Sequence, residues 1–280
     1  MAVEIAIRYY PTQLVSSMRF TDIHCHLLPG IDDGAKNWDD TLEMAAMALA
    51  DGTETIICTP HQLGSYSHRT GDEIRTLVSQ TQKVLDEHQI PLLILPGADV
   101  RIDSDMIDRL RSGDCVSLGD HRRHVLLELP HEMYMPLEPV LNQLRGIKML
   151  GILSHPERNQ GILRQPELLA PLVSSGCLMQ ITAESLLGVF GEQPQRLTEW
   201  MLLRGLVHFV ASDGHSPRRR KPLMSQAKMR VADLVGEEVA VAICCNNPAN
   251  VAAGRNIAHL PAARAQKKSW FSRLLSRSVA

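Results

Sequence analysis

Short apolar runs rich in β-branched residues recur along the chain and alternate with segments of helical periodicity. The runs are "RFTDIH", "TETIICT", "LLILPGADV", "HVLLELP", "MLGILSH", "CLMQIT" and "VHFVASD". The helical segments are "NWDDTLEMAAMALADG", "GDEIRTLVSQTQKVLDEHQ", "LEPVLNQLRG", "QPELLAPLVSSG" and "QPQRLTEWMLLRG". Apolar strands alternating with amphipathic helices predict parallel β–α units with both sheet faces covered. Seven such units favour an α/β fold of the closed or nearly closed barrel type over an open sheet.

Side chains of the kind that bind metals follow six of the seven runs. They are His24 and His26, His61, Asp99, Glu128, His155, and Asp213 with His215. The C-terminal ends of strands in a β/α barrel converge on one face, where active sites lie. The sixth run, "CLMQIT", has no obvious metal ligand. The pattern therefore predicts one cluster of donor side chains, built from six strand ends.

The stretch "TDIHCHLLPGIDDGA" places two histidines one residue apart. Residues two apart in an extended segment face the same way, so His24 and His26 can bind one ion together, while Cys25 points away and packs. One such pair fits a metal-free barrel lining equally well, and the repetition at other strand ends is what favours metal. With Asp33 the candidate donors number nine, more than the about four to six that one ion takes. We therefore expect two or three ions, with Glu128 as a bridge.

Mixed imidazole and carboxylate donors suit manganese, iron or zinc better than magnesium or calcium. Arginines lie close to two of the donor sites, Arg158 in "SHPERN" and the run Arg218–Lys221 in "ASDGHSPRRRK". A guanidinium presents a planar fork that matches phosphate, although at least two residues of the run are expected to lie on a solvated turn. Clustered divalent ions generate hydroxide near neutral pH and stabilise a displaced phosphate oxygen. The combination predicts hydrolysis of a phosphate ester by direct attack, without a covalent enzyme intermediate.

Composition and charge narrow the class of protein. The chain has 280 residues, 44% hydrophobic and 21% charged, with a formal net charge of −2, so nothing indicates a nucleic-acid partner. Six cysteines without C-x-x-C spacing predict free thiols in a reducing cytosol. The start of the chain does not read as a secretory leader, and no run approaches the roughly 18 apolar residues of a spanning helix. We therefore expect a cytoplasmic protein. The motifs of thiolate phosphatases, serine hydrolases and P-loop enzymes are missing from the sequence.

Six segments together resemble the polymerase-and-histidinol-phosphatase (PHP) superfamily, and more closely its bacterial branch of capsular-polysaccharide tyrosine-protein phosphatases. They are "DIHCHLLPGIDDGA", "TPHQLGSY", "LPGADVRI", "LLELP", "SHPERN" and "ASDGH", in the family's order. The resemblance implies the PHP fold, a distorted (β/α)7 TIM-like barrel, with a trinuclear and usually manganese centre. It also implies hydrolysis of phosphotyrosine on an autophosphorylating, membrane-associated bacterial tyrosine kinase that controls capsular or exopolysaccharide synthesis and export.

The resemblance also assigns roles by motif position. The implied metal ligands are His24, His26, Asp33, His61, Asp99, Glu128, His155, Asp213 and His215. Arg158 and one arginine of the 218–220 run, for which we choose Arg220, are expected to hold the phosphate. His215 or Asp33 would assist proton transfer to the leaving phenolate. Relatives usually carry glutamate where this chain has Asp99, and the shorter side chain is expected to weaken or shift the metal that it serves.

Two alternative functions are weighed against this one. The first is a small-molecule phosphomonoesterase of the same superfamily, similar to a histidinol phosphatase. The second is a non-catalytic module that docks on a kinase and in which the metal is structural. Donor sets as nearly complete as this one argue against the second, because structural sites seldom keep open positions.

The ends of the chain are predicted to lie outside the barrel. We expect an N-terminal extension at residues 1–17, with Met18 as an alternative start, a PHP phosphatase domain at 18–258, and a basic amphipathic tail at 259–280. Residues 262–280 carry Trp270, Phe271, Leu274 and Leu275 at helical spacing among basic residues. That pattern favours peripheral contact with anionic lipid at the inner membrane or with a partner helix, and a disordered or packed terminal helix is the alternative. The oligomeric state is left open.

Overall fold

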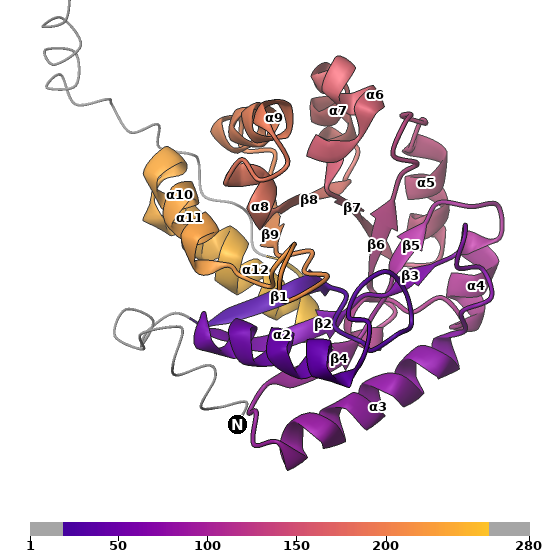
Figure 1. Ribbon diagram of the computed structural model, residues 1–280. Helices are drawn as coiled ribbons and strands as arrows, with labels where there is room; N and C mark the ends of the chain where they lie inside the picture. Colours follow the sequence, from indigo (N-terminus) through magenta and orange to yellow (C-terminus); the bar gives the residue numbers. More distant parts are fainter. Residues whose placement is uncertain (1–18, 258–280) are drawn as a thin grey trace, which may run out of the picture.

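The computed structural model describes residues 19–257, whose strands form two parallel sheets arranged as a ring (Figure 1). The first sheet has the order β1-β2-β4, with bounds Phe20–Cys25, Thr53–Cys58 and Leu93–Pro96. The second has the order β3-β5-β6-β7-β8-β9, with bounds His61–Gln62, Asp99–Arg101, His124–Glu128, Leu150–Ser154, Leu178–Thr182 and Phe209–Ala211. Each of the seven predicted runs contains a strand.

One of the seven runs contains a break and another is followed by a further short strand, which is why seven runs give nine strands. Residues 59–60 separate β2 from β3, and residues 97–98 separate β4 from β5. Pro60 has no N–H to donate to a ladder, but its carbonyl accepts a hydrogen bond from the Asp99 backbone N–H at 3.1 Å. The two interrupted strands therefore stay side by side across their breaks, and each serves as one long strand of a seven-membered ring.

The first and last strands lie next to each other, but within residues 19–257 no regular ladder joins them. One parallel bridge pairs Cys25 with Gly214. Beside it the His26 N–H donates to the Gly214 carbonyl, and the Asp213 N–H donates to the His24 carbonyl, both at 2.8 Å. The ring is thus held together at the C-terminal ends of β1 and β9 without being closed by strand pairing. The predicted distorted (β/α)7 barrel is confirmed in this form.

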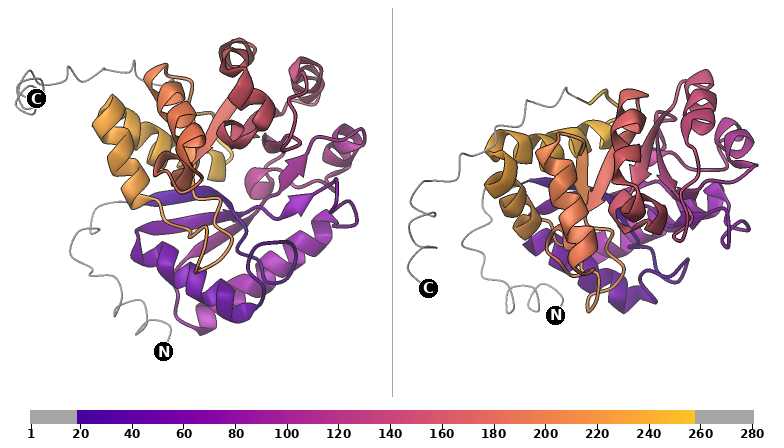
Figure 2. Two further views of the ribbon diagram at one scale, coloured as in Figure 1. Left: turned by 45° about the horizontal axis from the view of Figure 1, so that its top comes forward. Right: turned by 90° about the horizontal axis from the view of Figure 1, so that it is seen from above.

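Helices surround the strand ring on its outside (Figures 1 and 2). The longer ones are α2 (Trp38–Ala50), α3 (Gly71–Glu87), α5 (Glu138–Gly146), α9 (Glu192–Leu203) and α10 (Ser225–Val235). The shorter ones are α4 (Met106–Ser112), α6 (Gln160–Arg164), α7 (Leu169–Ser174), α8 (Ala183–Leu186), α11 (Glu237–Val241) and α12 (Asn247–Ala252). Single turns of other helix types are η1 (Leu118–Asp120), η2 (Pro156–Arg158), η3 (Pro166–Leu168) and the π-helical η4 (Ala242–Asn246). All five predicted helical segments contain helix.

Apolar side chains cover both faces of the strands, as buried parallel strands require. A small cluster inside the ring includes Ile23, Ile57, Leu126, Ile152 and Phe209. Two larger clusters fill the space between the strands and the surrounding helices. All six cysteines lie within the described residues and are free thiols, and Cys25 and Cys58 are fully buried as predicted.

The predicted N-terminal extension lies outside the described residues, and so does the basic tail together with its proposed membrane contact. Within residues 19–257 no helix combines the length and the apolar character needed to cross a bilayer.

Candidate active site

All nine predicted donor residues meet at the C-terminal ends of the strands. They form four overlapping groups in which the donor atoms lie within 4.8 Å of one another. The groups are His26, Asp33, His61 and His215; His24, His26 and Asp213; His24, Asp99 and His155; and His61, Asp99 and Glu128. The shared members link the groups into one cluster. The sequence pattern thus predicted which side chains come together, and their assignment as ligands stays a prediction.

The histidine pair of β1 faces Asp213, which follows β9. The Nε2 atoms of His24 and His26 lie 3.2 Å apart, on the same side of the chain as their spacing predicted. Asp213 Oδ1 lies 3.2 Å from His24 Nε2 and 3.5 Å from His26 Nε2. The ring of His215 lies against that of His26, with centroids 3.8 Å apart. The bridge between β1 and β9 therefore builds one half of the cluster.

Asp99 lies at the centre of the other half. Its Oδ2 atom is 3.6 Å from both His24 Nε2 and His61 Nδ1, and 3.9 Å from His155 Nε2. Glu128 Oε2 approaches His61 Nδ1 to 3.7 Å. Asp99 therefore reaches the cluster even though its side chain is one methylene shorter than that of glutamate.

Several of these buried donor atoms have no hydrogen-bond partner among the described residues. They are both carboxylate oxygens of Asp99, Oδ1 of Asp213 and Nε2 of His215. Burial, and then the charge of Glu128, raise the pKa of Asp99 well above its usual range. Leaving a buried carboxylate unpaired is costly, and a bound cation removes the cost. The donor set fits divalent metal ions, since it mixes imidazole and carboxylate groups.

Two residues that the sequence did not single out orient the histidines of β1. His26 Nδ1 donates to Asp32 Oδ2 at 2.6 Å, and Asp32 also accepts from the His61 backbone N–H at 3.1 Å. His24 Nδ1 donates to Gln180 Oε1 at 2.9 Å. These bonds fix the ring tautomers and leave both Nε2 atoms for the cluster, as outer partners of metal-binding histidines do. Gln180 belongs to β8, the one run that had no obvious ligand.

Three of the eight non-glycine residues with positive φ in the described part of the chain lie at this site. His155, Asp213 and Arg220 have positive φ values of 31°, 51° and 54°, in the left-handed region that side chains other than glycine rarely adopt. Arg220 is held by its carbonyl, which accepts a hydrogen bond from the His215 backbone N–H at 2.7 Å. Such strain persists where the surrounding structure enforces it, and it is enriched at functional sites. The loops after β7 and β9 are therefore shaped to aim these side chains.

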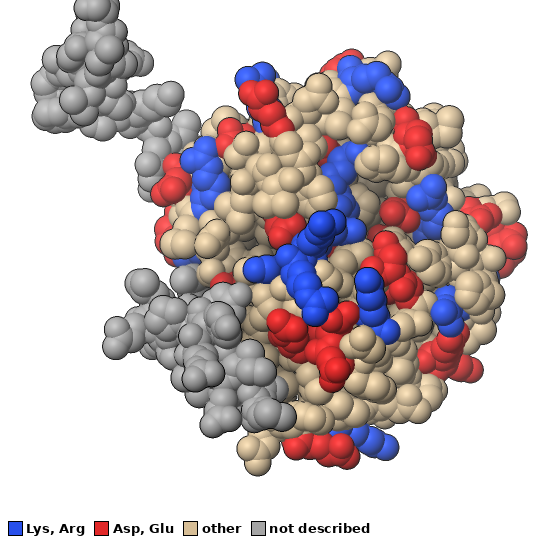
Figure 3. Space-filling view, in the orientation of Figure 1, with Lys and Arg blue, Asp and Glu red and all other residues tan. Residues whose placement is uncertain are grey.

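Arg158 and Arg220 converge on one oxygen of Asp213. Each donates through Nη2 to Asp213 Oδ2, and the bond from Arg220 measures 2.5 Å. Burial alone would raise the pKa of Asp213, but Arg158, His24 and Arg220 outweigh it and hold that pKa well below its usual range. Arg218 and Arg219 are exposed, whereas Arg220 shares its carboxylate partner with Arg158. The choice of Arg220 as a phosphate-binding residue stays a prediction. Figure 3 shows basic side chains gathered near the centre of this face, with acidic ones beside them.

Asp33 lies at the rim of the cluster. Its Oδ1 atom is 3.4 Å from His61 Nε2 and 3.5 Å from His215 Nε2. His215 and then His61 hold the pKa of Asp33 well below its usual range. Tyr66, from the segment "TPHQLGSY", stacks on His61 with ring centroids 5.4 Å apart. Asp33 is therefore an ionised carboxylate, suited to bind cations rather than to donate or accept protons.

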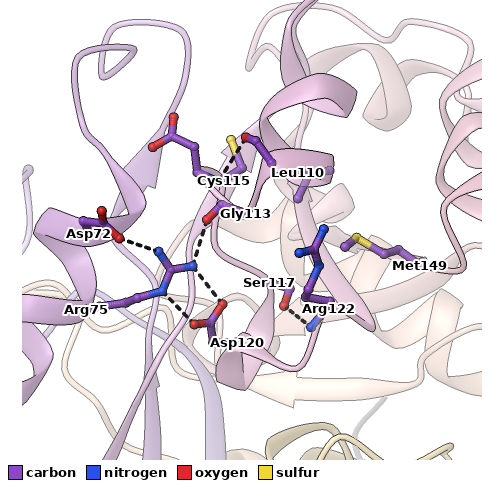
Figure 4. Close-up of a pocket in the computed structure, with 11 residues that line it drawn as sticks. Asp72, Arg75, Leu110, Gly113, Cys115, Ser117, Asp120, Arg122 and Met149 are labelled. Atoms are coloured by element: carbon purple, nitrogen blue, oxygen red, sulfur yellow. Dashed lines mark hydrogen bonds and ion pairs between the residues drawn. The ribbon is translucent and has the colours of Figure 1, made fainter.

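Another hollow, of about 420 Å³, lies at the N-terminal ends of β6 and β7, away from the donor cluster (Figure 4). Arg75 in its wall is neutralised by Asp120, with bonds of 2.7 and 3.1 Å. Cys115 is buried, and burial raises the pKa of its thiol to about 12. The hollow holds none of the nine predicted donors, and its charged and thiol groups are already engaged or unreactive.

His124 is the first residue of β6. It is completely buried, and neither ring nitrogen has a hydrogen-bond partner among the described residues. Burial, assisted by the nearby Arg123 and His121, lowers the pKa of His124 to about 4. It is therefore a neutral packing residue of the barrel and not part of the donor cluster.

Comparison with known proteins finds relatives that match most of the chain. YwqE of Bacillus subtilis, a tyrosine-protein phosphatase, is 37% identical over 201 residues, which cover 71% of this chain and 78% of YwqE. The tyrosine-protein phosphatase CpsB of Streptococcus pneumoniae is 26% identical over 235 residues, which cover 82% of this chain and 97% of CpsB.

Similarity to a solved structure extends this result to the fold. It comes from the crystal structures of YwqE from B. subtilis and CpsB from S. pneumoniae, described as unique metal-dependent tyrosine phosphatases. The match has a TM-score of 0.81 at 32% identity and covers 89% of this chain and all of the other (100%). A family model for capsular polysaccharide synthesis, CpsB/CapC, matches residues 20–253. The chain therefore belongs to the CpsB/CapC family of capsular polysaccharide synthesis, the branch that its motifs predicted.

Proposed function

We propose that this protein is a metal-dependent protein-tyrosine phosphatase. The observation that carries the proposal is the direct contact between the donor cluster and a pair of arginines, joined through the two oxygens of Asp213. Metal ions and guanidinium groups side by side can neutralise the oxygens of a phosphate monoester, which is the main task in phosphoryl transfer. The named activity of the relatives YwqE and CpsB supports the same reaction class.

The nine donors would hold the ions, and four of them belong to two donor groups each: His24, His26, His61 and Asp99. Bound divalent ions supply Lewis acidity and an activated water molecule, and this chemistry needs no cysteine nucleophile. Arg158 and Arg220 would bind the phosphate through the N–H groups that Asp213 does not use. Their Nε atoms are buried and have no partner among the described residues, so both remain available as donors. The clamp thereby positions the phosphorus atom against the donor cluster.

The leaving group of phosphotyrosine is a phenolate, whose conjugate acid has a pKa of about 10, so it departs with little help from a general acid. Of the two residues considered for proton transfer, we assign the role to His215. Asp33 is held ionised by its histidine neighbours, so it is suited to bind a cation rather than to carry a proton. His215 lies within 3.5 Å of both Asp33 Oδ1 and Asp213 Oδ1, which orients its ring at the rim.

The finer features of the proposal come from the family resemblance. We expect two or three manganese ions, with iron and zinc as the alternatives. The expected substrate is the phosphorylated, membrane-associated tyrosine autokinase of a capsular or exopolysaccharide system. The protein would act in the cytoplasm and reach the inner membrane through residues 262–280, and an oligomeric form is compatible with this arrangement.

Metal removal tests the proposal. Full-length protein is treated with a chelator, and turnover of a phosphotyrosine peptide is measured before and after manganese is added back, with circular dichroism as the control for folding. The expected result is loss of turnover with the fold retained, and recovery with manganese. Turnover that is unaffected by chelation would refute the metal-dependent mechanism. A metal-loaded protein that cleaves histidinol phosphate but no phosphotyrosine peptide would point to the small-molecule alternative.

A further inference from the structure

An aromatic side chain lies directly beside the two arginines. Phe190 belongs to the turn between α8 and α9, and the Cζ atom of Arg158 lies 4.8 Å from the centroid of its ring. The Cζ atom of Arg220 lies 5.9 Å from the same centroid. The proposed phosphate clamp therefore has an aromatic wall on one side, which neither the donor cluster nor the phosphate chemistry requires.

The turn that carries Phe190 is firmly held. The Val189 N–H donates to the Glu184 carbonyl at 3.0 Å, and the Gly191 N–H donates to the Gly188 carbonyl at 3.0 Å. Gly188 and Gly191 have φ values of 82° and 95°, which glycine adopts without strain. Phe190 is thus positioned by its own backbone.

Helix α8 also ties the turn to both arginine loops. Glu157, next to Arg158, accepts a hydrogen bond from the Thr182 backbone N–H at 2.8 Å, where α8 begins. Glu184, within α8, accepts one from the Lys221 backbone N–H at 3.2 Å, next to Arg220. These links fix the backbone at the start of the Phe190 turn relative to the backbones of both arginine loops. The aromatic ring and the clamp therefore form one preorganised unit.

The surface around Phe190 is apolar and open to solvent. Leu187 is 37% exposed and Val189 is 63% exposed, and both belong to the same turn. Large apolar side chains held at the edge of a charged site are candidates for contact with a substrate that is charged at one end and apolar at the other. Phosphotyrosine has this character, because a single oxygen atom separates its ring from the phosphorus.

We propose that Phe190 is a specificity-determining residue that packs against the aromatic ring of phosphotyrosine while Arg158 and Arg220 hold the phosphate. The inference rests on the proposed function and adds the basis for selecting aryl over alkyl phosphates. Aromatic pairs gain an increment beyond simple burial, equivalent to about 3- to 10-fold in affinity. Val189 and Leu187 extend the apolar rim toward the residues that flank the phosphotyrosine.

The competing explanation is that Phe190 only supports the guanidinium groups by cation–π contact. The two explanations predict a loss of binding for different sets of ligands when Phe190 is removed. Loss of a support for the arginines weakens the binding of every phosphate or phosphonate equally. Loss of an aromatic wall that contacts the substrate ring weakens the binding of only those ligands that carry a ring.

The experiment measures binding to manganese-loaded, full-length protein by calorimetry. The probes are benzylphosphonate, in which CH2 replaces the ester oxygen, and ethylphosphonate, which lacks the ring. Phe190→Ala is expected to reduce the preference for the benzyl ligand by about 3- to 10-fold, with ethylphosphonate binding unchanged. Phe190→Leu keeps apolar bulk and should lose less. Met229→Ala, an exposed apolar position on α10, is the matched control and should keep the wild-type preference.

An equal loss for both ligands, or an unchanged preference in Phe190→Ala, would overturn the inference. Turnover of a phosphotyrosine peptide by the wild-type protein is measured in parallel. If the wild type binds both phosphonates but does not cleave the peptide, the proposed function fails while the preference still tests Phe190. If it binds neither phosphonate, both proposals fail.

Discussion

Removal of Arg158 tests the proposed phosphate clamp most directly. The Arg158 side chain is 13% exposed and that of Arg220 is 28% exposed, so Arg158 would bind the phosphate in the environment that is less accessible to water. A hydrogen bond to a charged group contributes about 1.5–3 kcal/mol, which corresponds to about 10- to 150-fold in kcat/KM. We expect Arg158→Ala to lose activity toward the upper end of this range and Arg220→Ala toward the lower end.

The same geometry predicts little loss of stability. Asp213 Oδ2 accepts from both arginines, so either single variant leaves it with one guanidinium partner. Arg158→Lys keeps the charge but loses the planar fork, and it should recover only part of the activity. Because both arginines serve one phosphate and one carboxylate, the double variant should lose less than the product of the two single losses.

The assay is steady-state hydrolysis of a phosphotyrosine peptide, with thermal unfolding as the check on folding. Arg219→Ala is the matched control, because Arg219 belongs to the same basic run and is exposed. It should change kcat/KM by less than about twofold, as isolated surface charges do. Activity of Arg158→Ala near wild type, or a loss in Arg219→Ala as large as that in Arg220→Ala, would refute the clamp assignment.

Three further outcomes are expected. The pKa of His124 is about 4 in the folded protein and about 6.5 unfolded, so the unfolded chain binds the extra proton and stability falls as pH drops between these values. Between pH 7.5 and pH 5 this loss amounts to about 2 kcal/mol, and His124→Leu should remove it, as measured by urea unfolding of metal-free protein at both pH values. An equal fall in stability in the wild type and the variant would contradict this. Asp32→Ala frees His26 Nδ1 and should weaken manganese binding by about 10- to 100-fold in calorimetric titration, whereas unchanged affinity would remove Asp32 from the site. Asp51 accepts from the Met224 and Ser225 N–H groups at the start of α10, so Asp51→Ala should cost about 1–2 kcal/mol of stability while leaving kcat/KM intact.

Much of the fold and of the donor set could be predicted because both depend on strand ends. An apolar run marks a buried strand, and the first polar residue that ends it lies at the mouth of the barrel, as Glu128 does at the end of β6. The break at Gly97 within the third run, and the short strand that begins at His61 after Pro60, could not be predicted, since glycine and proline also occur where strands end. Helix α4 is seven residues long, too short for its periodicity to stand out.

The site residues that the sequence pattern did not predict owe their roles to local contacts rather than to a position at the end of a strand. Asp32 and Asp33 are adjacent in a turn, where no alternation rule says which carboxylate faces which histidine; Asp32 binds His26 Nδ1, while Asp33 approaches His61 and His215. Gln180 is an amide within an apolar run, and only the position of His24 gives it a role. Phe190 lies in a turn whose direction the sequence pattern does not encode.

The contact between β1 and β9 has a consequence for how the protein matures. Cys25 and Gly214 touch across 189 positions of the chain, so the donor group that joins His24 and His26 to Asp213 forms by closing a very long loop. During synthesis on the ribosome the histidine pair emerges early, and its aspartate partner emerges among the last parts of the barrel. A nascent chain therefore cannot complete this group, and phosphatase activity should begin only after the last strand has docked against the first.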